Sequence, residues 1–462
     1  MLFYPILFIS SFLLASFIRI NRFVFYALAE NSVALLNQLM ADTDEEAKIK
    51  AVQKGTSSLL LSLMKTLLVL LLAIAMGCIP LLLYCLLTKT APDDLVFNSF
   101  FLILLISLGT IVPFILPIPR KQRSAYSELS RLLHRIALNN YNIAFRLFKR
   151  ESRKISRLKL AQRQDFVIIS GLARAGTTSL MNALSNIHNF YSLNYANMPF
   201  LLCPNIWAKL YRPKSKKLRE RSHKDGIMIG LNSTEALEEF FFKVKANDAY
   251  IKDSHLEEYD LSIKDYSEYL DYQSIIKLNN HKIYLAKNNN FILRYNSVRG
   301  YNDDFVMVIL YREPLTQAAS LMEKHHEYLE LQEKDPFVLE YMDWLGHHEF
   351  GKNQKAFVFN NPELKIEGDK STLDYWLRIW INYYSHILRI SHPNTLKINY
   401  DSYCKNPKES IESILRKIGI EADLPHYIPF ENQRKVDHNY SRDIYKRAHD
   451  IYMRLSNRRS QN

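Results

Sequence analysis

The stretch Phe166–Leu184 reads FVIISGLARAGTTSLMNAL, and it decides the fold of this chain. Its apolar start, Phe166–Ser170, is typical of a buried strand, and the glycine turn that follows opens into a helical pattern. A strand, a loop of backbone N–H groups and a helix N-terminus form, in this order, a site for a phosphate-like anion. We therefore predict an α/β domain with a P-loop-like parallel sheet and the anion at this turn.

The turn differs from the Walker loop of nucleotide triphosphatases, which reads G-x-x-x-x-G-K-[ST]. Gly171 and Gly176 have the required separation, but Thr177 stands where the lysine belongs, and the cation is Arg174 inside the loop. We therefore expect an anion that resembles a phosphate but carries different chemistry. The residues expected to surround it are Gly171, Arg174, Ala175, Gly176, Thr177, Thr178 and Ser179.

A second apolar run, Phe305–Tyr311, repeats the arrangement of a strand followed by a helix. It ends in Arg312-Glu313-Pro314, and proline suits the first residue of a helix. Ser320 lies about two turns along that helix. We predict that Arg312 and Ser320 meet a second anion beside the first.

These residues carry a resemblance to a known family. The loop GLARAGTTSL and the later YREPLTQAAS resemble the two nucleotide-binding motifs of the sulfotransferases. The resemblance implies that the first motif holds the 5′-phosphosulfate of 3′-phosphoadenosine 5′-phosphosulfate (PAPS), and that Arg312 and Ser320 hold its 3′-phosphate. It covers roughly residues 165–425, including YLAKNNNFIL and NYDSYCKNPKESIESILRKIGI. The run PFVLEYMDWLGHHEFG is similar to a bacterial membrane-associated branch.

Sulfuryl transfer, like phosphoryl transfer, is catalysed mainly by positioning and by stabilising the charge on the leaving group. We assign this electrostatic role to Arg174, at a position where the cytosolic sulfotransferases usually have a lysine. Lys287, at an expected strand end, is a second cation that can approach the site. PAPS has no triphosphate, so no metal is expected, and the strand before Arg312 does not end in a Walker-B aspartate.

The acceptor must lose a proton, so a general base is expected. Members of the family use a histidine or a glutamate. The candidates are Glu235, Glu238 and Glu239 in LNSTEALEEFFFK, where Ser233 or Thr234 is expected to cap a helix. Glu238 and Glu239 begin an aromatic run in which burial would raise the pKa of a carboxyl group. His223 is a further candidate.

Two pairs of adjacent histidines invite a metal-site interpretation, which we do not favour. The pairs are His325-His326 and His347-His348. Adjacent residues face different sides of a helix, and no set of acids or cysteines completes either pair. His325 and His326 are expected on the exposed part of the helix that carries Ser320.

The first part of the chain has a different composition. Met1–Ile18, Thr66–Leu87 and Leu95–Pro117 are uncharged, and the last two are long enough to cross a bilayer core of about 30 Å as helices. Met1–Ile18 is interpreted as a third span or a membrane-dipping helix. Asp42–Lys54 is expected to be a charged connector. We predict an integral membrane protein with two to three transmembrane helices.

Positive charge predicts the orientation of these helices. The short Thr88–Asp94 loop has one lysine and two aspartates, whereas basic residues flank the opposite ends of the uncharged runs. These are Arg19, Arg22, Lys48, Lys50, Lys54, Lys65, Arg120, Lys121 and Arg123. The N-terminus is therefore predicted outside and the catalytic domain in the cytosol.

The chain of 462 residues is divided into four expected parts. They are a membrane anchor (1–120), a basic helical linker at the surface (121–163), a sulfotransferase domain (164–430) and a basic, solvated C-terminal tail (431–462). The net charge of +13 suits a polyanionic nucleotide and membrane lipid. No zinc spacing or recognised motif supports nucleic acid as a partner. Four cysteines form no disulfide framework, which favours a reducing compartment.

The resemblance implies a PAPS-dependent sulfotransferase with a hydroxyl or amine acceptor. A carbohydrate or glycolipid acceptor fits a site kept near the bilayer. Three alternatives remain open: a P-loop kinase with an aberrant loop, a catalytically inactive nucleotide-binding membrane protein, and a structural membrane protein in which the loop arose by chance. Nucleotide binding and turnover distinguish them.

Overall fold

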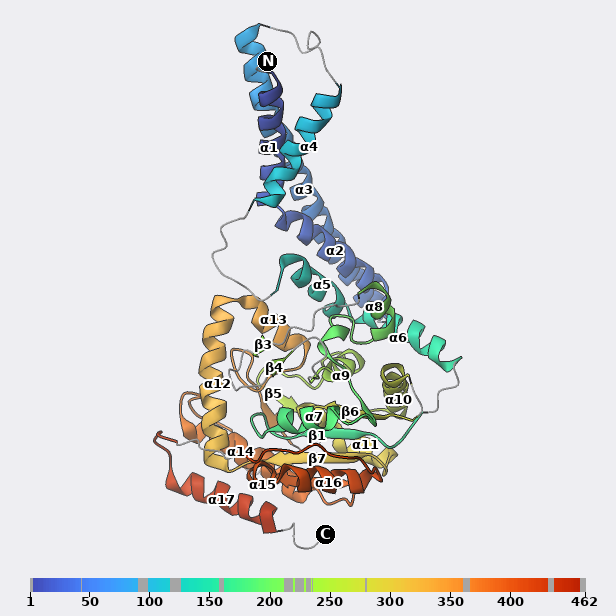
Figure 1. Ribbon diagram of the computed structural model, residues 1–462, viewed down its shortest axis with the longest axis vertical. Helices are drawn as coiled ribbons and strands as arrows, with labels where there is room; N and C mark the ends of the chain where they lie inside the picture. The colour runs from blue at the N-terminus through green and yellow to red at the C-terminus, as the bar shows by residue number, and fades with distance from the viewer. Residues whose placement is uncertain are drawn as a thin grey trace. The chain divides into compact units, whose positions relative to one another are not determined.

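The chain forms two compact units, Met1–Ile143 and Ala144–Asn462, in a computed structural model (Figure 1). The structure describes residues 3–42, 44–89, 99–116, 126–157, 162–211, 219–220, 228–229, 234, 236–278, 281–359, 366–430 and 436–457.

The first unit is helical. Its described helices are α1 (Phe3–Ile20), α2 (Phe23–Leu39), α3 (Glu45–Thr88), α4 (Ser99–Ile115) and α5 (Glu128–Leu138). Helix α1 lies along α3 and α4, and α2 lies along α3 (Figure 1). The contact between α1 and α3 is close, because a Cβ atom added at Gly77 would meet Leu14 at 3.1 Å.

Two described helices, α1 and α3, are long and apolar enough to cross a membrane, and α4 is a shorter apolar helix. The uncharged run Thr66–Leu87 lies within α3, as expected. The charged segment expected as a connector, Asp42–Lys54, is helical from Glu45 and runs directly into the apolar part of α3. Glu45 and Glu46 occupy its first turn, where negative charge favours the helix dipole.

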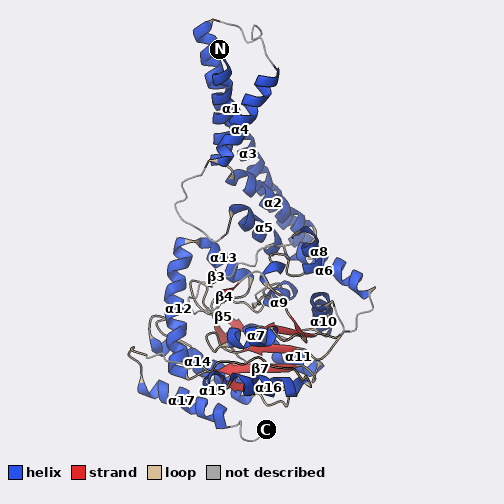
Figure 2. Cartoon of the chain, viewed as in Figure 1, coloured by secondary structure: helices blue, strands red, loops and turns tan. Residues whose placement is uncertain are grey.

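The second unit is built on a parallel sheet (Figure 2). Its strands stand in the order β2-β6-β1-β7-β9. Their bounds are β1 (Val167–Ser170), β2 (Phe190–Tyr191), β6 (Ile283–Lys287), β7 (Val306–Tyr311) and β9 (Thr395–Asn399). Every pairing in this sheet is parallel, so the carboxyl ends of β1, β6 and β7 meet at one edge. The α/β fold class with a parallel sheet is confirmed.

Burial on both faces explains why these strands read as continuous apolar runs. On one face, alternate residues of the sheet pack against α7 (Thr177–Ser185) and α16 (Pro407–Ile418). On the other, α10 (Ile263–Lys277) and the 3₁₀ helix η3 (Asn289–Arg294) lie against β6 and β1. Two small sheets pair β3 (Arg219–Glu220) with β4 (Met228–Ile229) and β5 (His255–Glu257) with β8 (Ala356–Val358).

The remaining helices are α6 (Tyr141–Ser156), α8 (Pro204–Leu210), α9 (Glu239–Ala246), α11 (Tyr295–Tyr301), α12 (Pro314–Lys334), α13 (Pro336–Trp344), α14 (Leu373–Arg389), α15 (Tyr400–Lys405) and α17 (Arg442–Asn457), with the 3₁₀ helix η2 (Tyr195–Asn197).

The segment expected as a basic helical linker forms two helices, α5 and α6. Helix α6 exposes basic side chains on one face and buries Phe148 against Phe241 and Tyr272 on the other. The tail differs from the prediction. The tail is wrong as a solvated segment over α17, which packs on α14 and α12. Its apolar stripe of Ala448, Ile451 and Leu455 is buried, because the basic residues lie on the other side of the helix.

Candidate active site

The loop between β1 and α7 has the backbone that its glycines predict. Gly171 and Gly176 have φ angles of 150° and 92°, and Arg174 itself lies in the left-handed region at 68°. A Cβ atom at Gly171 would stand 2.6 Å from the Leu310 carbonyl oxygen, and one at Gly176 would stand 2.1 Å from the Tyr400 ring. Glycine is therefore required at both ends of the loop.

The amides of Ser179 and Leu180 both donate to the Gly176 carbonyl, at 3.0 and 3.3 Å, so the hydrogen bonds of α7 begin at its third residue. The N-terminus of a helix is a favourable place for an anion. The Ala175 amide donates to the Leu172 carbonyl inside the loop at 3.2 Å. The Ser179 hydroxyl contacts the Tyr403 hydroxyl at 3.3 Å, which ties α7 to α15.

The second motif begins where the sequence predicts. Helix α12 starts at Pro314, and the Glu313 carboxylate accepts the amides of Leu315 and Thr316. Ser320, two turns along, is buried, and its hydroxyl accepts a hydrogen bond from Arg174 Nε at 3.0 Å. The two motifs, far apart in sequence, therefore touch.

Arg312 lies beside the loop through its contact with Tyr400. Its guanidinium lies over the Tyr400 ring at 5.2 Å, and the same ring packs against Gly176. Arg312 and Ser320 thus border the loop through different neighbours, Tyr400 and Arg174.

Lys287 supplies a further cation from the neighbouring strand. It is the last residue of β6 and pairs in register with Ile169 of β1. The buried Nζ donates to the Thr178 hydroxyl at 2.9 Å. A lysine from β6 thus lies beside the first turn of α7, next to a loop that has Thr177 where the Walker pattern has its lysine.

Glu238 and Glu239 are buried at the start of α9. The helix begins at Glu239, so the expected cap at Ser233 or Thr234 is wrong for the part of the chain that the structure describes. Glu235, His223 and Ser233 lie outside the described residues.

The two carboxylates have opposite surroundings. Both oxygens of Glu239 accept from the Arg294 guanidinium at 2.7 Å, and Tyr250 donates to it as well. Burial by itself would raise the pKa of Glu239, but Arg294 lowers it overall. Burial raises the pKa of Glu238 to about 7 against the hydrogen bonds that it accepts from Tyr269 and Asn288.

A run of three asparagines after Lys287 holds this region together, and the sequence alone gave no reason to single it out. The Asn288 side chain donates to Glu238 at 3.0 Å and to Glu239 at 2.9 Å. Asn289 donates to Glu349 at 3.2 Å. Asn290 donates to the Gly346 carbonyl at 2.8 Å.

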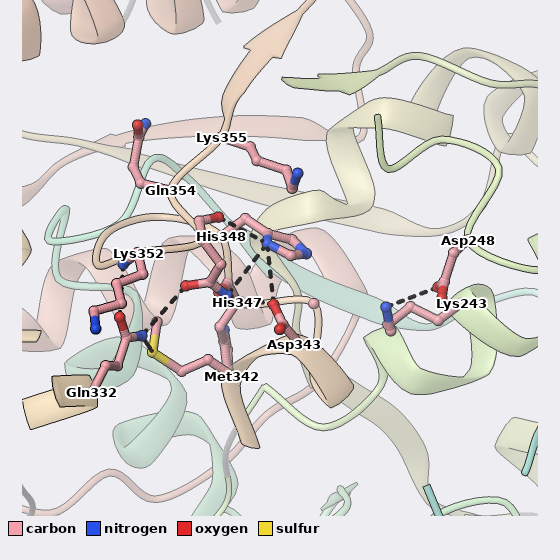
Figure 3. Close-up of polar contacts among 12 residues, drawn as sticks. Lys243, Asp248, Gln332, Met342, Asp343, His347, His348, Lys352, Gln354 and Lys355 are labelled. Atoms are coloured by element: carbon pink, nitrogen blue, oxygen red, sulfur yellow. Dashed lines mark hydrogen bonds and ion pairs between the residues drawn. The ribbon is translucent and has the colours of Figure 1, made fainter. Parts of the chain in front are cut away.

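The turn after α13 places its two histidines differently. His347 Nδ1 lies 3.5 Å from Glu349 Oε1. His348 is buried and turned to the Asn353 carbonyl at 3.1 Å and the Asp343 carboxylate at 3.8 Å (Figure 3). Burial lowers the pKa of His348 to about 4, and the nearby Lys243 adds to this effect.

The carboxyl group of Glu349 stays ionised over the whole neutral range. Burial by itself would raise its pKa, but His347, a backbone amide and Lys287 together lower it to about 2. Lys287 therefore acts electrostatically on both Thr178 and Glu349.

The other histidine pair differs from the prediction in one member. His325 is buried, and its Nδ1 accepts the Gly351 amide at 3.1 Å, whereas His326 is exposed as expected. Over the described residues, no group of three or more histidine, cysteine, aspartate or glutamate side chains is arranged to hold a metal ion.

No protein-family model and no curated protein matches the sequence. Among solved structures, the chain is similar to the sulfotransferase STF1 from Mycobacterium tuberculosis H37Rv, with 11% identity, 73% of this chain and 88% of that chain covered, and a TM-score of 0.37. It is also similar to the sulfotransferase STF9 from Mycobacterium avium, with 10% identity, 72% of this chain and 79% of that chain covered, and a TM-score of 0.36. For a sulfotransferase from Alicyclobacillus acidocaldarius the identity is 12%, the coverage is 64% of this chain and 96% of that chain, and the TM-score is 0.33. At these values the assignment of function rests on the residues of the site.

Proposed function

We propose that this chain is a membrane-anchored sulfotransferase that moves the sulfuryl group of PAPS to a hydroxyl or amine acceptor. The observation that carries the proposal is the hydrogen bond from Arg174 to Ser320, which joins the anion-binding loop to the second motif. A loop that binds a single phosphate needs no second motif beside it. A nucleotide with anions at two positions needs donors at both, and the contact between Arg174 and Ser320 brings two sets of donors together.

The residues at the loop fit a nucleotide with two anionic ends. Arg174, Lys287 and the Thr178 hydroxyl are cationic or hydrogen-bond donors beside the first turn of α7. The glycines at both ends of the loop keep the backbone close enough for amide contacts. Arg312 and Ser320 would hold the 3′-phosphate, and the loop would hold the 5′-phosphosulfate.

PAPS supplies an activated sulfuryl group, and the chain supplies positive charge where the leaving nucleotide gains negative charge. Arg174 and Lys287 are suited to this stabilisation, since both border the start of α7 or its loop. Arg174 remains protonated throughout, so its contribution is electrostatic and it transfers no proton.

The membrane anchor is part of the same proposal. Helices α1 and α3 have the length and composition of transmembrane helices, and α4 would pack with them as a third apolar helix. The distribution of lysine and arginine supports a cytosolic catalytic unit. An anchored enzyme would meet acceptors at the bilayer surface, such as a glycolipid or a lipid-linked sugar.

Calorimetric titration of the detergent-purified chain tests the co-substrate. We expect 3′-phosphoadenosine 5′-phosphate (PAP) to bind and ATP with Mg²⁺ to bind much more weakly. The opposite order would move the chain to the P-loop kinases. Binding of PAP without turnover would support the catalytically inactive alternative.

A pair of arginine variants tests the second motif. Arg312→Ala is expected to weaken binding of PAP more than that of adenosine 5′-phosphate, which lacks the 3′-phosphate. Arg416→Ala, at an exposed position of α16, is the matched control and should change neither affinity. Equal losses for the two nucleotides in Arg312→Ala would remove the second motif from the proposal.

A further inference from the structure

The two buried glutamates, Glu238 and Glu239, are poorly placed to accept the proton in the proposed reaction. Both oxygens of Glu239 are occupied by Arg294, and both oxygens of Glu238 accept hydrogen bonds from Tyr269 and Asn288. Glu238 is 1% exposed and Glu239 is 3% exposed. A general base must reach the acceptor hydroxyl directly or through one water molecule, and neither carboxylate meets this condition.

A second pair lies nearer to the loop. The Lys287 ammonium bonds to Thr178 at the start of α7, and it also acts on the Glu349 carboxylate. Glu349 faces His347 at 3.5 Å. The hydrogen bond from Asn289, two residues after Lys287, to Glu349 places the Glu349–His347 pair beside the end of β6, the strand whose Lys287 contacts the loop helix. The His347 side chain is 24% exposed, so this imidazole is open to a small molecule in a way that the α9 glutamates are not.

The pair is held in place from the sheet. Asn289 donates to Glu349, and Asn290 donates to the carbonyl of Gly346, the residue before His347. Gly346 has a φ angle of 67°, and a Cβ atom there would stand 2.7 Å from Glu239 Cγ. The turn therefore packs directly against α9, and the asparagines fix it to the end of β6.

One polar atom beside the pair lacks a partner. The Asn289 side-chain oxygen is buried and accepts no hydrogen bond from any residue that the structure describes. A buried polar atom without a partner is uncommon in proteins and marks a position that a bound group can complete. It belongs to the same side chain that holds Glu349.

We propose that His347 is the general base of this sulfotransferase and that Glu349 is its positioning residue, an inference that rests on the proposed function. Glu349 faces Nδ1, which keeps the proton on that nitrogen and leaves Nε2 as the acceptor. Nε2 takes the proton of the acceptor hydroxyl as that oxygen forms its bond to sulfur. The bond from sulfur to the nucleotide oxygen breaks, and its electron pair leaves with PAP.

The test compares variants of the full chain in n-octyl β-glucoside, which serves as detergent and as a hydroxyl acceptor of glycolipid chemistry. PAP release from PAPS is measured for the wild type, His347→Gln, Glu349→Gln and the control His426→Gln, whose histidine is exposed. We expect His347→Gln to lose at least 100-fold in turnover while it binds PAP within threefold of the wild type. His426→Gln should match the wild type.

Glu349→Gln separates positioning from folding. We expect a smaller loss of turnover, and we expect the acidic limb of the pH profile to move to lower pH, because the carboxylate that favours the imidazolium is gone. The charged groups around the pair are Lys287 of β6 and Glu349 itself, with Glu239 of α9 behind Gly346. A purely structural role would lower the rate at every pH without moving the limb.

A second measurement needs no acceptor. Carbethoxylation of His347 by diethyl pyrocarbonate, followed by mass spectrometry, should fall several-fold when PAP saturates the protein, and that of His426 should not. Unchanged turnover in His347→Gln, or His347 modified equally with and without PAP, would overturn the assignment of the base alone. Failure of the wild type to bind PAP would overturn the proposed function and the inference with it.

Discussion

Two pairs of titratable side chains near the end of β6 are held by the asparagines at positions 288–290 and yet have different surroundings. Glu238 and Glu239, at the start of α9, are buried among aromatic rings and Arg294. His347 and Glu349, on the turn after α13, are partly exposed. The comparison separates two carboxylates that are buried and hydrogen-bonded within the protein from a histidine that is open to solvent and that the proposed mechanism uses as the base.

The physical reason lies in desolvation. A buried carboxylate must be paired or protonated, and here Glu239 is paired with Arg294 while the pKa of Glu238 rises to about 7. Because Asn288 donates to both, the two carboxyl groups are neighbours, and ionisation of one opposes ionisation of the other. The first region is thus buried and internally paired, whereas His347 in the second is 24% exposed.

Removing the arginine of the buried pair should have the largest effect. Arg294→Met leaves Glu239 ionised and unpaired in the interior, so we expect the free energy of unfolding to fall by about 3–5 kcal/mol. Thermal melting monitored by tryptophan fluorescence measures the change, with Arg416→Met on the surface of α16 as the control. A variant as stable as the control would mean that Glu239 is not committed to structure.

The next effect concerns pH. The folded-state pKa of Glu238 is raised, so the folded chain holds this proton over a window in which the unfolded chain releases it, from about 4.5 to about 7. Stability is therefore complete at low pH and falls as the pH rises through that window. The loss amounts to about 3 kcal/mol at most.

Glu238→Gln cannot ionise, so this part of the loss should vanish. Melting curves of the wild type and the variant at pH 5 and pH 8 measure the difference, because the other titrating groups are common to both. The same pH dependence in the two proteins would show that Glu238 is ionised when buried.

Gly346 joins the two regions, and its substitution should affect both. Gly346→Ala places a methyl group against Glu239 at a φ angle of 67°, so we expect a loss of about 1–2 kcal/mol in stability together with reduced turnover. Gly300→Ala, where a Cβ atom meets nothing within 4 Å, is the matched control. Equal effects of the two substitutions would show that the contact with α9 does not matter.

The smallest effect is expected at Asn289. Asn289→Ala removes one hydrogen bond to Glu349, worth about 1 kcal/mol, and should lower turnover a few-fold without changing PAP affinity. The exposed Asn296 provides the control variant Asn296→Ala. An equal loss of PAP affinity would place Asn289 in nucleotide binding instead.

Much of the region around the β1–α7 loop could be predicted from local sequence. The loop Gly171–Gly176, the helix start at Pro314 and the strand end at Lys287 all follow from short patterns that need particular backbone conformations. The meeting of Arg174 with Ser320 was anticipated only as a common neighbourhood. The contact itself depends on β1 and β7 being adjacent in the sheet.

The surroundings of His347 could not be predicted in the same way. Its neighbour Glu349 is only two residues away, but the turn that carries both is held by Asn289 and Asn290, from a segment about 60 residues earlier in the chain. Glu238 and Glu239 look equivalent in sequence, and only Arg294, from η3, makes one of them ionised and leaves the other with a raised pKa.

The sequence by itself determined the parallel α/β class, the anion-binding loop and the apolar helices of the first unit, because strand, turn and helix patterns are set by residues close together in the chain. Only the tertiary structure decided which charges face one another. Lys287 reaches Thr178, Arg294 reaches Glu239 and Asn289 reaches Glu349 through packing between distant segments. Electrostatic effects depend on distance and burial, and both are fixed only when the chain has folded.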